Sequence, residues 1–200
     1  KAELFNEYFS AQQAALPIPD GYTLPAIDYV TNSRLNTIQC TEEDIKTVLE
    51  KLDVSKASGP DGISNRILKN TSDSISAPLS KLINKSFATG KFASDWKLAN
   101  LSPVYKIEHK QIKLNYRPIS LLSCLSKVQE RIAFNGLYEY CVENNLLIWK
   151  NSGFKQLDST INQLIHITHK IYKAMQDDQD ACLVFLDISK AFDKVWHEGI

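Results

Sequence analysis

Residues 181–193 of the chain read ACLVFLDISKAFD, in which a continuous apolar run passes directly into a charged segment. Residues 181–186 have the length of a β-strand and no polar alternation, and this pattern predicts a strand that is buried on both faces. Asp187 follows the run at once, and a carboxylate there is costly to desolvate unless it caps a helix, meets a cation or binds a metal ion. Position alone leaves helix capping and metal binding open for Asp187.

The rest of the chain is predicted to be mostly helical, with one β-hairpin. Residues 101–106 and 119–122 are predicted to be two short strands that flank a basic stretch, which makes them the two strands of the hairpin. The predicted fold class is therefore α+β. The helical spacing of apolar residues, together with start and stop signals, predicts helices over about 1–14, 41–52, 63–68, 75–89, 126–143 and 159–176.

Composition excludes several classes of protein. The chain has 200 residues, of which 44% are hydrophobic and 23% charged, and these globular values exclude disordered, collagen-like and coiled-coil chains. No apolar run approaches the roughly 20 residues that span a bilayer, so no membrane segment is predicted. The chain begins with Lys1 and shows no secretory signal, and we expect it to be a piece of a longer protein. Its four separated cysteines suit a reducing compartment, so we expect an intracellular protein that is not secreted.

The charges are unevenly distributed, although the net charge of the chain is zero. Residues 97–131 hold seven basic and two acidic residues, so this segment carries a charge of +5 and the remainder −5. A basic segment in an otherwise acidic chain is a candidate surface for phosphates. On charge alone, a solvated lysine-rich hairpin explains the same pattern equally well.

Residues 185–195, FLDISKAFDKV, closely resemble motif A of reverse transcriptases, specifically those of LINE-type (non-LTR) retrotransposons. The resemblance covers about residues 41–200 and rests on several segments in the family's order. It implies the fingers of a right-hand polymerase, mostly helical with a β-hairpin, followed by the first palm strand. The other segments are KASGPDGI at 56–63, WK at 96–97, SPVYK at 102–106, NYRPISL at 115–121, and SGF, ST and QL at 152–154, 159–160 and 163–164.

The resemblance also implies an activity and its partners. The full-length parent would be an RNA-directed DNA polymerase that copies RNA into DNA by nucleotidyl transfer with two Mg²⁺ ions. Its partners would be an RNA template, a DNA primer and deoxynucleoside triphosphates, and its location the cytoplasm and the nucleus. Within this chain, residues 1–40 would form an N-terminal helix and connector, residues 41–180 the fingers, and residues 181–200 the incomplete start of the palm.

Three residues near the end of the chain match the family's catalytic centre. Asp187 matches the first catalytic aspartate, which binds metal, and the backbone carbonyl of Ile188 matches the next metal-ligand position. Phe192 matches the residue whose bulk excludes a 2′-hydroxyl, while an ordinary core phenylalanine remains the alternative. The other catalytic carboxylates of the family would lie beyond Ile200, so this fragment alone is expected to be inactive.

Two cations of the basic segment match nucleotide-binding residues of the family. Arg117 matches the fingers arginine that holds the incoming triphosphate, because a guanidinium makes bidentate phosphate contacts. Lys106 matches its companion lysine. Lys110 is the alternative, since the loop reads KIEHK where many relatives have a turn rich in Gly and Pro. Asp61 in the GPDG loop is interpreted as a turn former or a template contact rather than a catalytic group.

Two other functions stay open at the level of the sequence. One is a nucleic-acid-binding remnant without catalysis. The other is a group II intron-type maturase, which shares this polymerase core. The residues of the segments KASGPDGI and NYRPISLL favour the retrotransposon polymerase over the maturase.

Overall fold

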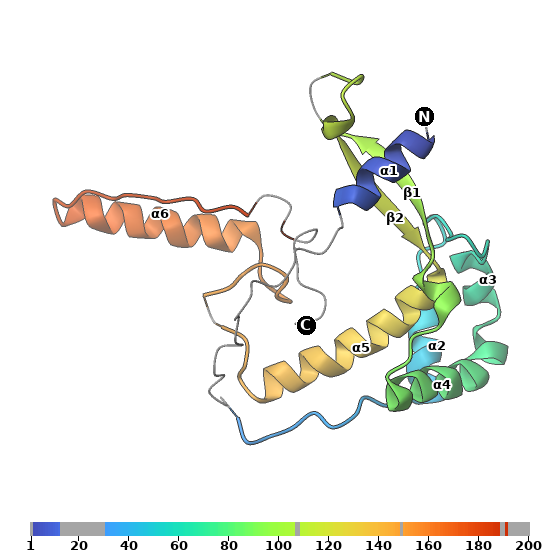
Figure 1. The fold of residues 1–200 in the computed structure, drawn as a ribbon. Helices are drawn as coiled ribbons and strands as arrows, with labels where there is room; N and C mark the ends of the chain where they lie inside the picture. Colours follow the sequence, from blue (N-terminus) through green and yellow to red (C-terminus); the bar gives the residue numbers. More distant parts are fainter. Residues whose placement is uncertain (1, 13–30, 107–108, 149, 189–190, 192–200) are drawn as a thin grey trace, which may run out of the picture. The chain divides into compact units, whose positions relative to one another are not determined.

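The computed structural model describes residues 2–12, 31–106, 109–148, 150–188 and 191 of the chain (Figure 1). These residues form two compact units, one that holds the described residues up to Tyr140 and one that holds those from Cys141 onward. In chain order the elements are α1 (Ala2–Gln12), α2 (Glu42–Glu50), α3 (Asn65–Asn70), α4 (Ser72–Thr89), the 3₁₀ turn η1 (Ser94–Lys97), β1 (Ala99–Tyr105), the 3₁₀ turn η2 (Lys113–Asn115), β2 (Tyr116–Leu122), α5 (Cys124–Glu143) and α6 (Thr160–Gln176).

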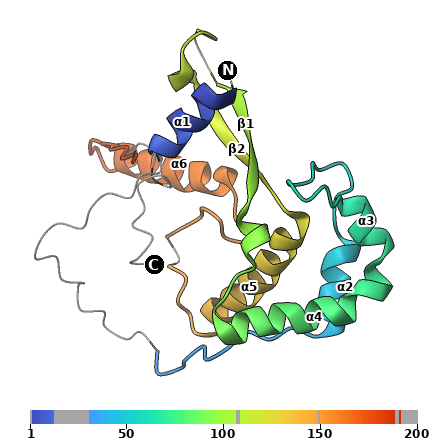
Figure 2. The same ribbon diagram turned by 45° about the vertical axis from the view of Figure 1, so that its right-hand side comes forward.

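The core of the first unit lies among α2, α3, α4 and the first half of α5, which gather on one side of the hairpin (Figure 2). The helix α2 begins with a capping box, in which Thr41 Oγ1 accepts from Asp44 N and the Asp44 carboxylate accepts from Thr41 N. The Thr41 backbone N–H and the Thr41 hydroxyl both donate to the Asp44 carboxylate and hold the pKa of Asp44 below its usual range. Ile45 and Leu49 follow one turn apart and are completely buried, which confirms the apolar stripe predicted for this helix.

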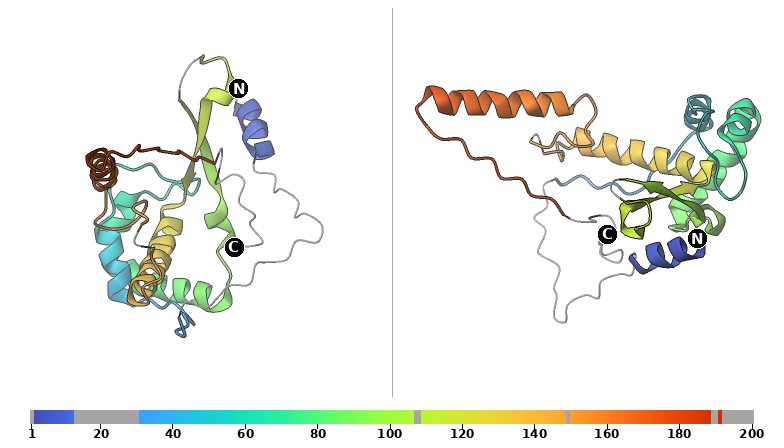
Figure 3. Two further views of the ribbon diagram at one scale, coloured as in Figure 1. Left: turned by 90° about the vertical axis from the view of Figure 1, so that its left-hand side faces the viewer. Right: turned by 90° about the horizontal axis from the view of Figure 1, so that it is seen from above.

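The predicted hairpin is confirmed, with strands longer than the sequence pattern indicated. The strands β1 and β2 pair antiparallel, with Ala99 opposite Leu122 and Tyr105 opposite Tyr116. In both views of Figure 3 the helix α1 lies alongside this hairpin. Phe5 of α1 makes an edge-on contact with Tyr116, with the ring centroids 4.9 Å apart. The hairpin therefore has one face that packs against α1 and one that does not.

An amide side chain of α4 binds the backbone of the segment that precedes α2. Asn84 Oδ1 accepts from Cys40 N at 2.9 Å, and Asn84 Nδ2 donates to Cys40 O at 2.8 Å. Both backbone hydrogen-bonding groups of Cys40, a buried residue, are thus satisfied by a helix more than forty positions later.

We expect Asn84→Ala to lower the free energy of unfolding by about 2 kcal/mol, because it leaves the N–H and C=O of a buried residue without partners. Urea denaturation of the chain measures this loss. The matched control is Lys85→Ala, since Lys85 is the next residue on α4 and its side chain is exposed. Equal stability of the two variants would contradict the prediction.

The second unit is built around α6, whose start is fixed by Ser159, with Ser159 Oγ accepting from Asn162 N at 3.3 Å. This confirms the predicted helix start, but α6 buries no residue within the described part of the chain. Apolar side chains on one side of α6, such as Leu164, Ile165 and Tyr172, are about two-thirds exposed. Among the described residues, no helix has both the length and the apolar composition that a membrane crossing requires.

The strand predicted at residues 181–186 is absent from the structure, and its predicted burial is wrong. Residues 181–188 are neither helix nor strand, and Val184, Phe185 and Leu186 are 76%, 84% and 92% exposed. A strand needs a neighbour that accepts and donates its backbone hydrogen bonds. In the described residues the only two strands, β1 and β2, pair with each other, so this apolar run has no strand partner there.

Candidate nucleic-acid interface

The β-hairpin carries the two cations that the resemblance assigns to the nucleotide phosphates. Arg117 stands opposite Val104 in the antiparallel register. The backbone N–H of Lys106 donates to Asn115 O at 2.8 Å, which continues the ladder one step past the end of β1. Because side chains alternate along a strand and register partners share a face, Lys106 and Arg117 project from the same face of the hairpin. Both side chains are exposed.

The alternative lysine of the loop lies on the opposite face, the one that packs against α1. Tyr105 and Tyr116 meet there with ring centroids 5.6 Å apart, and Lys110 Nζ lies 5.7 Å from the centre of the Tyr105 ring. Tyr116 Oη also donates to Lys110 O at 2.9 Å, which holds the loop to this side. Of the two lysines, Lys106 is therefore the one that shares a face with Arg117.

The KASGPDGI segment packs against the junction between β2 and α5. A methyl group at Gly59 would lie 2.5 Å from Ser123 N and 2.6 Å from Leu122 C, so the position has room only for glycine. Ser123 Oγ donates to Asp61 Oδ2 at 2.6 Å, and Asp61 Oδ1 accepts from Ile63 N at 3.1 Å. Asp61 thus forms its own turn and ties this loop to the end of the NYRPISLL segment.

A second group of cations lies where α2 and α5 meet. Lys127 and Arg131 of α5 line a groove of about 520 Å³ together with Lys51 and Asp53, which follow α2. Asp53 is engaged locally, since its Oδ1 accepts from Ser55 N at 2.9 Å and from Ser55 Oγ at 2.7 Å. Lys51 was not among the residues predicted from the sequence to contact phosphates. The one local feature that favours a cation at Lys51 is its place at the C-terminal end of α2, where the helix dipole is negative.

The matches to the catalytic centre lie at the end of the second unit. Asp187 is exposed, and the side chain of Ile188 is 71% exposed. Phe192 lies outside the described residues. Arg117 belongs to the first unit and Asp187 to the second, and the nucleotide-binding role of Arg117 and the metal-binding role of Asp187 stay predictions.

A metal centre is not complete in the described part of the chain. No three or more His, Cys, Asp or Glu side chains of the described residues come close enough together to hold an ion. Asp187 and the carbonyl of Ile188 offer two oxygen ligands, whereas each Mg²⁺ takes six. The residues that the structure describes therefore do not by themselves fit a two-metal site.

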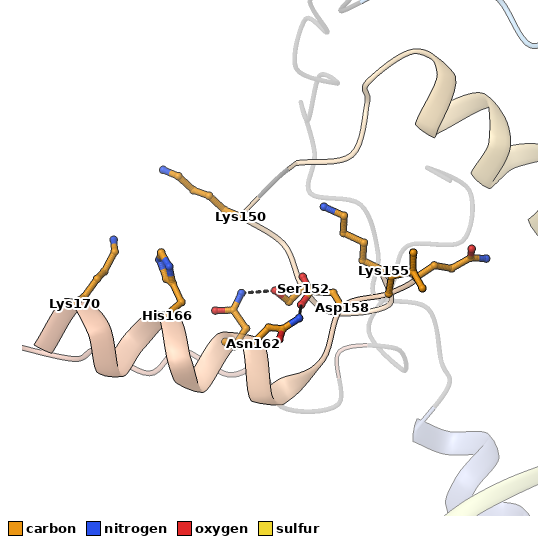
Figure 4. Close-up of a pocket in the computed structure, with 10 residues that line it drawn as sticks. Lys150, Ser152, Lys155, Asp158, Asn162, His166 and Lys170 are labelled. Carbon is orange, nitrogen blue, oxygen red and sulfur yellow. Dashed lines mark hydrogen bonds between the residues drawn. The ribbon is translucent and has the colours of Figure 1, made fainter. Parts of the chain in front are cut away.

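The SGF, ST and QL segments meet at the start of α6 (Figure 4). Gln163 Nε2 donates to Ser152 Oγ, which ties the helix to the preceding loop. Asp158 Oδ1 accepts from Ser159 N at 2.8 Å and from Asn162 Nδ2 at 3.0 Å. Hydrogen bonds from Ser152, the Ser159 backbone and Asn162 hold the pKa of Asp158 below its usual range, so this carboxylate is ionised at neutral pH.

The chain is similar to known RNA-directed DNA polymerases. Residues 107–200 match the family described as reverse transcriptase (RNA-dependent DNA polymerase). The chain is 33% identical over 159 residues, 79% of its length, to a probable RNA-directed DNA polymerase from transposon BS of Drosophila melanogaster. It is also 33% identical over 162 residues, 80% of its length, to the RNA-directed DNA polymerase from mobile element jockey of the same species.

A third relative matches over the whole chain. The RNA-directed DNA polymerase from mobile element jockey of Drosophila funebris is 27% identical over 205 residues, which cover 100% of this chain and 22% of the relative. The chain covers 18% of the transposon BS polymerase and 18% of the Drosophila melanogaster jockey polymerase. The chain therefore spans about a fifth of the length of the curated relatives it matches.

Proposed function

Because this chain contains part of a reverse transcriptase domain and is homologous to RNA-directed DNA polymerases of non-LTR retrotransposons, we propose that it forms the fingers and the start of the palm of such a polymerase. Residues 41–180 would be the fingers and residues 181–200 the start of the palm. In the complete polymerase this part would hold the RNA template and the incoming deoxynucleoside triphosphate. The observation that carries the proposal is the common face of Lys106 and Arg117.

The chemistry of this face suits phosphates. A guanidinium offers two parallel N–H donors to phosphate oxygens, and a lysine ammonium adds a compact positive charge. Val104 and Ile119, which share the face by strand alternation, are 43% and 47% exposed. The face is therefore cationic, partly apolar and not covered by α1, which would leave room for the bases or sugars of a bound strand.

The proposed catalytic residues belong to the polymerase as a whole. Asp187 and the carbonyl of Ile188 would be the part of a divalent metal site that this chain contributes, with Mg²⁺ as the proposed ion. Phe192 would exclude nucleotides that carry a 2′-hydroxyl. The other carboxylates of the site would come from residues beyond Ile200, and the DNA primer would lie against the same region.

We also propose an intracellular location. Cys40, Cys124, Cys141 and Cys182 are all free thiols in the structure, and the first two are buried. Burial raises the pKa of the Cys40 and Cys124 thiols, which keeps them protonated and unreactive. Buried free thiols support a reducing compartment such as the cytoplasm or the nucleus.

We expect the double substitution Lys106→Gln with Arg117→Gln to weaken binding of single-stranded RNA by the 200-residue chain about tenfold at about 100 mM salt. The slope of log affinity against log salt should fall by about 1.4, since each lost phosphate contact removes about 0.7 for a single strand. Fluorescence anisotropy of a labelled oligonucleotide across a salt series measures both quantities.

The matched control removes the same number of positive charges from the hairpin region, but on the face that packs against α1. Lys110→Gln with Lys113→Gln removes two cations beside tyrosines, since Lys113 Nζ lies 4.9 Å from the centre of the Tyr8 ring. This pair is expected to change RNA affinity less than about threefold. Equal losses in the two double variants would contradict the assignment of binding to the face of Lys106 and Arg117.

A further inference from the structure

The second unit contains a groove of about 710 Å³ that the proposed polymerase roles leave unassigned. Its walls are the loop that precedes α6 and the first three turns of α6 (Figure 4). Lys150 and Lys155 come from the loop, and His166 and Lys170 come from the helix. In Figure 4, His166 and Lys170 rise from the same side of α6, and Lys150 lies toward that side.

The groove carries an excess of positive charge. Its charged lining residues are three lysines and one carboxylate, Asp158. The Oδ1 atom of Asp158 is engaged by Ser159 N and Asn162 Nδ2, which fix the start of α6. The other lining groups include hydrogen-bonding side chains such as Gln163. The groove is therefore suited to a ligand that brings several negative charges.

The polar residues form a row along α6. Asn162, His166 and Lys170 recur every four residues, so they lie one above another on one side of the helix, with a rise of about 6 Å between successive residues. The exposed apolar residues, among them Leu164 and Met175, fall on the opposite side by the same 100° periodicity. A protein segment that covered the apolar side would therefore leave the polar row open.

We propose that this groove binds the sugar-phosphate backbone of a single nucleic-acid strand, as a contact separate from the hairpin face. A linear row of donors matches a polymer of phosphates better than one small anion, and the groove volume far exceeds the roughly 30 Å³ of a water molecule. The proposal rests on the proposed function, because a polymerase holds an extended strand that passes more than one surface.

The test is His166→Gln with Lys170→Gln in the 200-residue chain, with labelled single-stranded RNA and DNA of about 20 nucleotides and the same sequence. We expect affinity to fall about fivefold at about 100 mM salt and the salt slope to fall by about 0.7 to 1.4. Equal losses for RNA and DNA indicate recognition of the phosphates, and a larger loss for RNA indicates an additional contact to the 2′-hydroxyl. Both outcomes support the groove.

The matched control is His169→Gln with Lys173→Gln, which has the same residue types and spacing on the same helix but does not line the groove. We expect this control to change affinity less than about twofold, with unchanged circular dichroism in both variants. Equal losses of affinity in the two double variants, or no loss in His166→Gln with Lys170→Gln, would overturn the proposal. The hairpin variants would still test the proposed function separately. A parent chain that binds neither oligonucleotide would overturn both.

Discussion

Deoxynucleotide incorporation is expected to fall at least about a thousandfold when Asp187 is replaced by asparagine in a polymerase of the relatives' full length that carries residues 1–200. Asparagine keeps the shape of the side chain but removes the negative charge that a hard divalent cation prefers in its ligands. A thousandfold loss corresponds to about 4 kcal/mol, which is the order of the charge stabilisation that a metal ion supplies. Extension of a DNA primer on an RNA template, followed over time, measures the loss.

Asp180→Asn is the matched control, because Asp180 is exposed in the acidic segment after α6 and undergoes the same chemical change. This control is expected to retain activity, and both variants should keep the melting temperature of the parent. Full activity of the Asp187→Asn polymerase would remove Asp187 from the catalytic centre. Incorporation by the isolated 200-residue chain would show that the carboxylates assigned to the region beyond Ile200 are not needed.

Gly59→Ala is expected to lower the free energy of unfolding of the first unit by about 3 kcal/mol, as overpacking of a close contact does. The added methyl group would meet Ser123 N at 2.5 Å and Leu122 C at 2.6 Å, and both are backbone atoms that no side-chain rotation can move away. The loop would have to separate from the β2–α5 junction, which would also stretch the hydrogen bond from Ser123 to Asp61. Urea denaturation measures the effect.

Gly62→Ala in the same loop separates this steric effect from the effect of backbone conformation. Gly62 has a φ of +68° and no atom within 4 Å of an added methyl group, so its alanine variant is strained only by its dihedral angle. We expect it to cost about 1 kcal/mol. If Gly59→Ala cost no more than Gly62→Ala, the loop would not be held against the junction as the structure has it.

The elements that the sequence determined are those whose signals are local. The helix after Thr41 follows from a capping box and an apolar stripe, both contained within a dozen residues. The β-hairpin follows from two short strand segments joined by a basic loop. The family could also be predicted from the sequence, because several segments resemble those of the family and occur in the same order. The comparisons with polymerases of mobile elements confirm this prediction.

The tertiary structure decided the features that depend on contacts between residues far apart in the chain. The sequence matches Lys106 to the companion lysine but leaves Lys110 open as the alternative, and only the register of Val104 with Arg117 puts Lys106 on the face of Arg117. The run at residues 181–186 shows the same dependence, because its composition predicts a buried strand while the described residues provide no neighbour. A strand is defined by hydrogen bonds to another strand, so its apolar pattern alone determines neither its pairing nor its burial.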